Sequence, residues 1–231
     1  MISRRQAMTG GAVLCVASCA RPDTAALVDD AAAAPLPVMD FAPPFSLQPL
    51  PPGFVHRRFW TRAPMTMALA RRDGIDALRC ETRASASMLV RQVDIAIERR
   101  PLLAWRWLVE VPIEAGADER TREGDDHPAR FFLGFRTGAG ERRAMEIVWG
   151  NRVLARGDWK YLGTFPHYVA NGGMANVGRW HDEQVDLRAL VAQAWPQDTP
   201  VSISEIGVFC DSDETRSRSV AWFAAVRLLR G

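Results

Sequence analysis

Lysine is nearly absent from this chain. Its 231 residues include 29 basic ones, of which only Lys160 is a lysine and the others are arginines. The 27 acidic residues almost balance them and leave a formal net charge of +2. Proteins that bind nucleic acids usually carry a basic excess or a basic stripe. Because this sequence has neither, we expect no nucleic-acid partner.

Long apolar runs are missing as well. A transmembrane helix needs about eighteen or more consecutive apolar residues, and the sequence contains no such run. The hydrophobic fraction of 48% and the charged fraction of 24% are typical of a globular protein, which argues against a disordered or collagen-like chain.

The motifs of common enzyme classes are also absent. The chain has no G-x-S-x-G, H-E-x-x-H or P-loop sequence. Its four histidines and four cysteines show no metal-ligand spacing. The sequence therefore indicates no cofactor, apart from a calcium ion considered below.

Residues 1–18 have the pattern of a bacterial export signal. The basic pair Arg4-Arg5 precedes an apolar stretch that is too short to span a bilayer. This pair resembles the twin-arginine signal, and the sequence leaves that route and the general secretory route open.

The signal ends in Val16-Ala17-Ser18-Cys19, which resembles the bacterial lipobox. The resemblance implies cleavage before Cys19 and lipidation of its thiol, which would anchor the protein in a membrane. Cleavage of an ordinary signal at a later alanine-rich site is the alternative. Because Ala20 rather than aspartate follows the cysteine, the resemblance implies the outer membrane rather than the inner one. We therefore expect a lipid-anchored periplasmic protein of the cell envelope.

Two further cysteines, Cys80 and Cys210, lie in strand-like segments. Export permits a disulfide between them, if their strands are adjacent. Two free buried thiols are the equally open alternative.

Residues 19–52 are rich in alanine and proline. This composition favours an extended, polyproline-like chain over a packed core. We expect a tether here, with Phe41, Phe45 and Leu47 apolar enough to dock its end on a domain formed by residues 53–231.

Strand patterns dominate that domain. Residues 103–111 alternate, with apolar side chains on one face and Arg106 and Glu110 on the other. Asp73-Gly74 is a strong hairpin signal. Residues 159–169 predict one weaker strand, because Pro166 interrupts it.

A single helix is expected near the C-terminal third. Asp182 can cap it, and the residues at helical spacing are Leu187, Leu190, Val191 and Ala194. With roughly nine or ten short strands beside this one helix, the sequence predicts an all-β, mainly antiparallel fold. The closest architecture is a jelly-roll-like β-sandwich.

A first candidate ligand site is formed by Asp125, Asp126 and Arg130, which lead into a buried strand. The carboxylates can bind Ca²⁺ or sugar hydroxyls, and arginine suits a carboxylate or phosphate. The alternative is structural, because Arg130 can pair with Asp125 or Asp126 to satisfy a half-buried charge.

A second cluster, Asp211, Asp213 and Glu214, concentrates negative charge in one loop. Such a loop is either solvated or holds a cation, and calcium is the candidate. Aromatic residues near strand ends offer faces on which sugars stack, although in a sandwich they are more often core. They are Trp149, Trp159, Tyr161 and Trp180.

Four segments in order resemble the bacterial family known as domain of unknown function 3047. They are Pro101 to Trp107, Asp125 to Arg130, Ile147 to Gly150 and Asp211 to Thr215. The resemblance supports the fold and the site candidates Asp125, Asp126, Arg130, Trp149, Asp211 and Asp213 without implying a reaction. The last third also resembles jelly-roll carbohydrate-binding modules, in Trp180 and Val185-Asp186-Leu187.

Two function classes follow. The first is a non-catalytic, lipid-anchored envelope module that binds a glycan or another small polar ligand. The second is a glycan-acting hydrolase or lyase, whose two carboxylates would come from Asp125, Asp126, Glu146, Asp211 and Asp213.

Overall fold

The computed structural model describes residues 26–28, 34–114 and 116–231. The predicted signal peptide, residues 1–18, and the predicted lipidation site, Cys19, lie outside these residues. No helix in the described part of the chain is long and apolar enough to cross a membrane.

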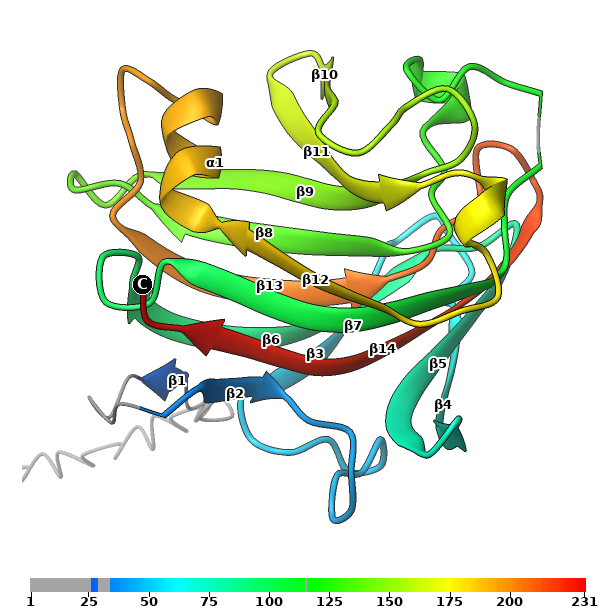
Figure 1. Cartoon of the computed structure of the whole chain (residues 1–231), viewed down its shortest axis with the longest axis horizontal. Coiled ribbons are helices and arrows are strands. Elements are labelled where there is room, and N and C mark those ends of the chain that lie inside the picture. The colour runs from blue at the N-terminus through cyan, green and yellow to red at the C-terminus, as the bar shows by residue number, and fades with distance from the viewer. Residues whose placement is uncertain (1–25, 29–33, 115) are drawn as a thin grey trace, which may run out of the picture.

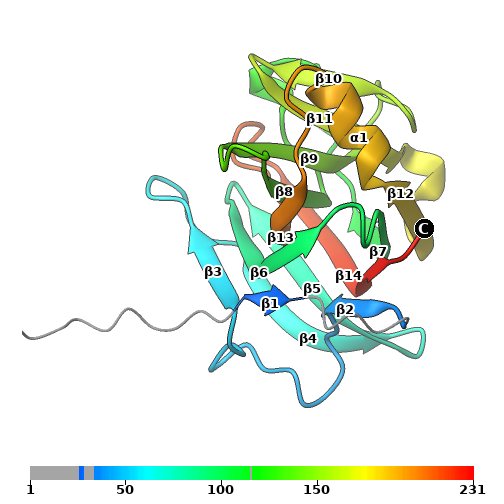
Figure 2. The same ribbon diagram turned by 90° about the vertical axis from the view of Figure 1, so that its left-hand side faces the viewer.

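The described residues form two β-sheets that pack face to face (Figures 1 and 2). The larger sheet has eight strands in the order β1-β6-β13-β8-β9-β11-β10, with β3 also paired to β6. These strands are β1 (Leu27–Val28), β3 (Phe54–Arg58), β6 (Ser87–Ala96), β8 (Arg130–Arg136), β9 (Arg142–Gly150), β10 (Trp159–Leu162), β11 (Phe165–Gly172) and β13 (Ser202–Phe209).

The smaller sheet has six strands in the order β12-β7-β14-β5-β4, with β2 also paired to β14. They are β2 (Leu36–Met39), β4 (Thr66–Arg72), β5 (Ile75–Arg83), β7 (Leu102–Val111), β12 (His181–Asp186) and β14 (Arg218–Leu229). Nearly all pairs are antiparallel, while β1 with β6 and β9 with β11 are parallel. The predicted all-β sandwich with mainly antiparallel strands is confirmed.

Aromatic side chains fill the space between the sheets. Trp105 and Trp107 point inward from β7 and contact Phe131 of β8. Trp107 also packs edge-on against Trp149 of β9, with 5.7 Å between ring centroids. The alternation predicted for residues 103–111 is therefore confirmed, because its apolar face forms the core while Arg106 and Glu110 lie on the other face.

The predicted Asp73-Gly74 hairpin joins β4 to β5. Both residues have positive φ, 53° and 80°, which Asp and Gly tolerate better than other residues. By contrast, residues 159–169 do not form one interrupted strand. Gly163, with φ 62°, turns the chain so that β10 and β11 pair as a hairpin, and Pro166 lies opposite Tyr161.

The predicted helix exists as α1 (Leu187–Ala194), but its predicted cap was wrong. Asp186 is the N-cap, and its carboxylate accepts a hydrogen bond from the Arg188 amide. Asp182 instead lies within β12, opposite Arg106 of β7. Strand pairing with β7 keeps residues 181–186 extended, so the helix starts four residues later than the cap at Asp182 implied.

The predicted tether also differs from the structure at its C-terminal end. Residues 36–39 pair with β14, and Val38, Met39 and Phe41 are buried in the main core. Alternating apolar residues outweigh the high proline content here because a strand of the sandwich is available to pair with them. The sandwich therefore includes strands before residue 53, namely β1 and β2. The structure also contains more strands than predicted, since β1, β2 and β10 are too short for a clear sequence pattern.

Cys80 and Cys210 are both fully buried, and both are free thiols. The Cys210 thiol donates to the carbonyl oxygen of Cys80 at 3.6 Å. Of the two alternatives left by the sequence, the structure has the free buried thiols.

Candidate functional site

Arg130, the first residue of β8, is the centre of a buried charged network. Its side chain is 3% exposed, and it donates to Glu146 of β9 from Nε at 2.6 Å. It also pairs with Asp211 and with Asp125, whose Oδ1 lies 3.2 Å from Nη2. A buried guanidinium requires such partners, because an unpaired charge would cost several kcal/mol. Arg130 and these three carboxylates, with the residues that join them below, are called the Arg130 network.

The register of the large sheet extends this network across three strands. Lys160 of β10 lies opposite His167 of β11, which in turn lies opposite Glu146 of β9. Residues directly opposite in a sheet share a face, so all three side chains lie on the face that also carries Arg130. The only lysine of the chain is thus a buried member of the network.

Lys160 links two loop residues to the strands. Its Nζ donates to Asp125 Oδ1 at 2.5 Å and to His127 Nε2 at 2.7 Å. Because an ammonium group has only donors, Nε2 of His127 must accept, and Nδ1 donates to the carbonyl oxygen of Trp149 at 2.7 Å. His127 is therefore neutral and held in one tautomer.

Burial governs the titration of this network. It raises the pKa of Glu146 to about 7, although Arg130 opposes the shift. It lowers the pKa of His167 to about 3, with Arg130 contributing in the same direction. Burial also opposes ionisation of Asp125, but the charges of Arg130 and Lys160 outweigh it and hold the pKa of Asp125 below its usual value. Asp125 is thus the ionised partner of both cations.

Glu119 connects the network to the loop after β9. Its carboxylate is 3% exposed and accepts four backbone N–H groups, those of residues 151–154, at 2.5–3.0 Å. Its carbonyl oxygen accepts from Lys160 at 2.7 Å. One buried anion therefore fixes the conformation of the whole loop.

The second predicted cluster lies next to the first, although 80 or more residues separate them in sequence. Carboxylate oxygens of Asp126, Asp211, Asp213 and Glu214 lie within 4.8 Å of one another. Burial and the neighbouring carboxylates raise the pKa of Glu214 to about 7.

Each of these four carboxylates already has a protein donor. Asp126 accepts from the Thr215 amide at 2.6 Å, and Asp211 accepts from the His127 amide and from Arg130. Asp213 and Glu214 both pair with Arg62. The four carboxylates would have to give up these partners in order to bind a cation. Calcium binding stays a prediction.

The side chains of five of the six predicted site residues thus lie close together in the structure. Asp125, Arg130 and Asp211 pair directly, and Asp126 and Asp213 adjoin them. Of the two pairings offered by the sequence, Arg130 uses Asp125; Asp126 bonds to Thr215 instead.

Trp149 takes part differently from the other five. Its ring, 1% exposed, belongs to the core, and its carbonyl oxygen contacts His127. The ligand-binding role of the six residues stays a prediction.

Sequence reasoning missed Glu119, His127, Lys160 and His167 as members of this network. Lys160 carried a usable signal, since a single retained lysine in an arginine-rich chain is unusual. Glu119 carried none, because nothing in its sequence context indicates that it accepts four amides of a loop more than 30 residues away.

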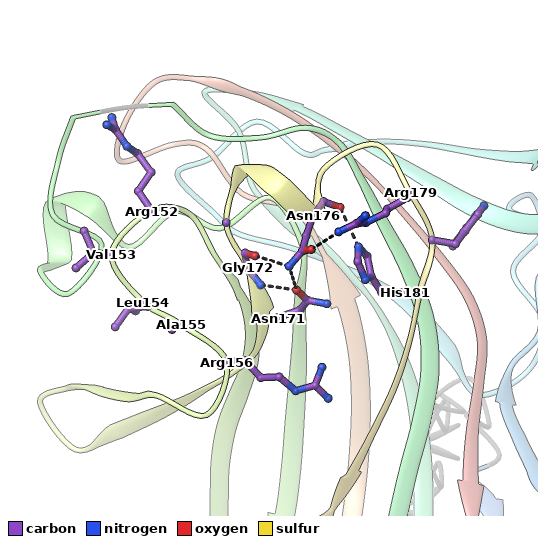
Figure 3. A pocket seen from close by; sticks show the side chains of 12 residues that line it. Arg152, Val153, Leu154, Ala155, Arg156, Asn171, Gly172, Asn176, Arg179 and His181 are labelled. Carbon is purple, nitrogen blue, oxygen red and sulfur yellow. Dashed lines mark hydrogen bonds between the residues drawn. The ribbon is translucent and has the colours of Figure 1, made fainter.

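Beside the network lies an open cavity of about 630 Å³, lined by the loop after β9 and by the connection between β11 and β12 with its flanking strand ends (Figure 3). We call it the arginine–asparagine pocket. Its lining residues are Arg152, Val153, Leu154, Ala155, Arg156, Asn171, Gly172, Gly173, Asn176, Arg179, Trp180 and His181. Residues 152–154 belong to the loop that Glu119 holds, so the buried network supports one wall of this pocket.

Hydrogen bonds fix the polar groups of the pocket (Figure 3). Asn176 Nδ2 donates to Asn171 Oδ1 and to the Gly172 carbonyl, both at 2.9 Å. Arg179 donates to Asn176 Oδ1 at 2.7 Å, and His181 bonds to the Asn176 carbonyl at 2.8 Å. These side chains converge on Asn176, while Arg152 points away from them.

Gly172, which lines the pocket, packs closely against the backbone of Gly150. Gly150 and Gly172 are register partners in β9 and β11. A Cβ atom on Gly172 would lie 2.6 Å from the Gly150 carbonyl oxygen, a distance too short for any real Cβ contact. Glycine is required here for the close approach of the two strand backbones.

Fold and site together define a β-sandwich protein with a buried ionic framework at one end and a polar pocket beside it. A family model described as "Protein of unknown function (DUF3047)" matches residues 56–227, and the chain belongs to this family. The family predicted from the sequence is therefore confirmed. No curated protein matches the chain.

Solved structures with a similar fold include carbohydrate-binding modules. The family 30 carbohydrate-binding module of a cellulosomal cellulase from Clostridium thermocellum is 10% identical, with a TM-score of 0.41, and the match covers 85% of this chain and 98% of that one. The xyloglucanase domain of a type three effector from Sinorhizobium fredii, in complex with cellobiose, is also 10% identical. Its TM-score is 0.40, and the match covers 76% of this chain and 91% of that one.

Proposed function

We propose that this protein is a non-catalytic module that binds a glycan in the arginine–asparagine pocket. The observation that carries the proposal is the pocket itself, whose lining combines guanidinium and amide groups with Trp180. Sugar hydroxyls need converging donors and acceptors, and the apolar faces of sugars stack on aromatic rings. Trp180 is the one aromatic residue predicted for sugar stacking that lines this pocket.

The alternative, a hydrolase or lyase, has weaker support. Glu146 and Asp211, two of the carboxylates it needs, are less than 10% exposed and are paired with Arg130. A general acid or a nucleophile has to reach the substrate. Burial and pairing favour a structural role for these carboxylates.

The test is a glycan-binding screen that also detects turnover. We expect saturable binding of at least one oligosaccharide, with no new products by mass spectrometry. Trp180→Ala should weaken this binding about tenfold, which corresponds to a loss of about 1.4 kcal/mol of contact with the ring. Trp60→Ala is the matched control, because Trp60 is a fully exposed tryptophan outside the pocket. A thermal melt verifies that both variants are folded.

Two results would contradict the proposal. Loss of binding in Trp60→Ala but not in Trp180→Ala would place the ligand elsewhere. Product formation that continues at the same rate per amount of protein after further purification would support the enzyme instead.

We further propose that the protein is exported and anchored by lipid on Cys19, in the outer membrane rather than the inner one. The support is the sequence Val16-Ala17-Ser18-Cys19. Cys19→Ala should move the protein from the membrane fraction to the soluble periplasm. Unchanged fractionation would exclude lipidation as the anchor.

A further inference from the structure

The lining of the arginine–asparagine pocket is strongly basic. Arg152, Arg156 and Arg179 contribute to it, and no aspartate or glutamate is among its described lining residues. One buried acidic residue next to the pocket partly balances this charge. Glu183, whose side chain is 1% exposed, pairs with Arg156 at 3.0 Å. The pocket therefore retains positive charge within a chain whose acidic and basic residues nearly balance overall.

Two of the arginines are held at the ends of one chain of contacts. Arg156 pairs with Glu183, and the other oxygen of Glu183 accepts from Asn171 Nδ2 at 2.5 Å. Asn171 accepts from Asn176, which accepts from Arg179. In Figure 3, Arg156 and Arg179 approach the asparagine pair from different sides. Their side chains are thus ordered before any ligand binds, which lowers the entropic cost of binding.

Neither guanidinium is saturated by these contacts. Each offers five N–H donors, and the described contacts of Arg156 and Arg179 use one nitrogen of each. The planar arrangement of these donors matches the paired oxygens of a carboxylate or a phosphate. Neutral sugar hydroxyls do not require this geometry.

We propose that the pocket selects an anionic saccharide, whose carboxylate or phosphate group binds Arg156 and Arg179. The inference rests on the proposed glycan-binding function and specifies its ligand class. Arg152, which points outward at the rim, attracts the anion without holding it.

The experiment compares matched pairs of ligands on the full chain in detergent, by isothermal titration calorimetry. The first pair is tetragalacturonate and its methyl ester, which differ only in the charged groups. The second pair is glucose 6-phosphate and glucose, which tests phosphate as the source of the anion. Inorganic phosphate alone tests whether the sugar is needed.

We expect the charged member of at least one pair to bind about tenfold more tightly than its neutral partner, as one charge-assisted hydrogen bond would give. Arg179→Gln should lower the affinity for the charged ligand about tenfold and leave the affinity for the neutral ligand within about twofold. Arg142→Gln is the charge-matched control at the exposed start of β9, and it should leave both affinities unchanged.

Each contrary outcome has a distinct meaning. Equal binding of charged and neutral sugars would overturn this inference and leave the proposed function standing. Inorganic phosphate that binds as tightly as the charged sugars would overturn the saccharide part of the inference. Absence of binding for every saccharide in the glycan-binding screen and in both pairs would overturn both proposals.

Discussion

At the scale of single residues, burial and the number of partners decide what a charged side chain does. Arg130 and Arg156 are both arginines paired with a carboxylate, but Arg130 is surrounded by three of them and buried, whereas the Arg156 side chain is 61% exposed. The first is fixed in the framework, and the second is available to a ligand. The sequence gives no sign of this difference.

Asp125→Asn is expected to destabilise the protein by about 3–5 kcal/mol, because it leaves buried Arg130 and Lys160 without their shared ionised partner. Urea unfolding measures the loss. Asp198→Asn is the control, since Asp198 pairs with Arg143 at the surface, and we expect a loss of about 1 kcal/mol or less there. Equal losses in the two variants would show that the Arg130 network is not a structural unit.

The raised pKa of Glu214 predicts how the stability of the protein depends on pH. Its folded pKa of about 7 lies above its ordinary value of 4.5, so its contribution to stability is complete below pH 4.5 and is lost as the pH rises through 7. Glu214→Gln removes this loss.

The variant should therefore gain stability relative to wild type between pH 4 and pH 8. The gain is on the order of 1 kcal/mol, since one pKa unit corresponds to about 1.4 kcal/mol and the group is partly solvated. Thermal melts across this pH range measure it. A constant difference between the two proteins would contradict the expectation.

At the scale of elements, strand pairing overrides local sequence preference in several places. Residues 181–186 extend as β12 rather than beginning a helix, because β7 offers them a full set of partners. Pro166 is accepted within β11 opposite Tyr161 of β10, one residue before the pairing of β11 with β9 begins at His167. The local patterns that did hold are those reinforced by packing, such as the Trp105 and Trp107 face of β7.

The loop between β9 and β10 depends on a residue outside it. Glu119→Gln should cost about 2–3 kcal/mol, because a neutral amide oxygen replaces a carboxylate that accepts four N–H groups. Hydrogen exchange should show faster exchange at residues 151–154. Glu123→Gln, an exposed change in the adjacent turn η1 (Arg122–Gly124), is the control and should leave exchange unchanged. Unaltered protection in Glu119→Gln would mean that the loop holds its shape without this carboxylate.

At the scale of the whole molecule, the N-terminal boundary of the domain can be tested by truncation. A chain starting at Ala34 retains β2, and we expect it to fold like the full chain. A chain starting at Gly53 loses Val38, Met39 and Phe41 from the core. Each buried apolar side chain contributes about 1.5–3 kcal/mol, so the second chain should be several kcal/mol less stable or should aggregate. Equal melting temperatures for both chains would restore the predicted boundary at residue 53.

The sequence by itself determined the fold class of this protein. Alternating apolar residues, turn signals and the Trp105–Trp107 strand specify a β-sandwich, because side chains of a strand alternate between its two faces wherever the strand is placed. The four ordered segments identified the family. These are local patterns, and each is complete within about ten residues.

Only the tertiary structure decided the site. The Arg130 network draws on residues 119, 125, 127, 130, 146, 160, 167 and 211, and the arginine–asparagine pocket draws on two separate loops. These groups meet through the order of strands in the large sheet and through the parallel pairing of β9 with β11. Strand order and register arise from packing across the whole core, and no short stretch of sequence contains that information.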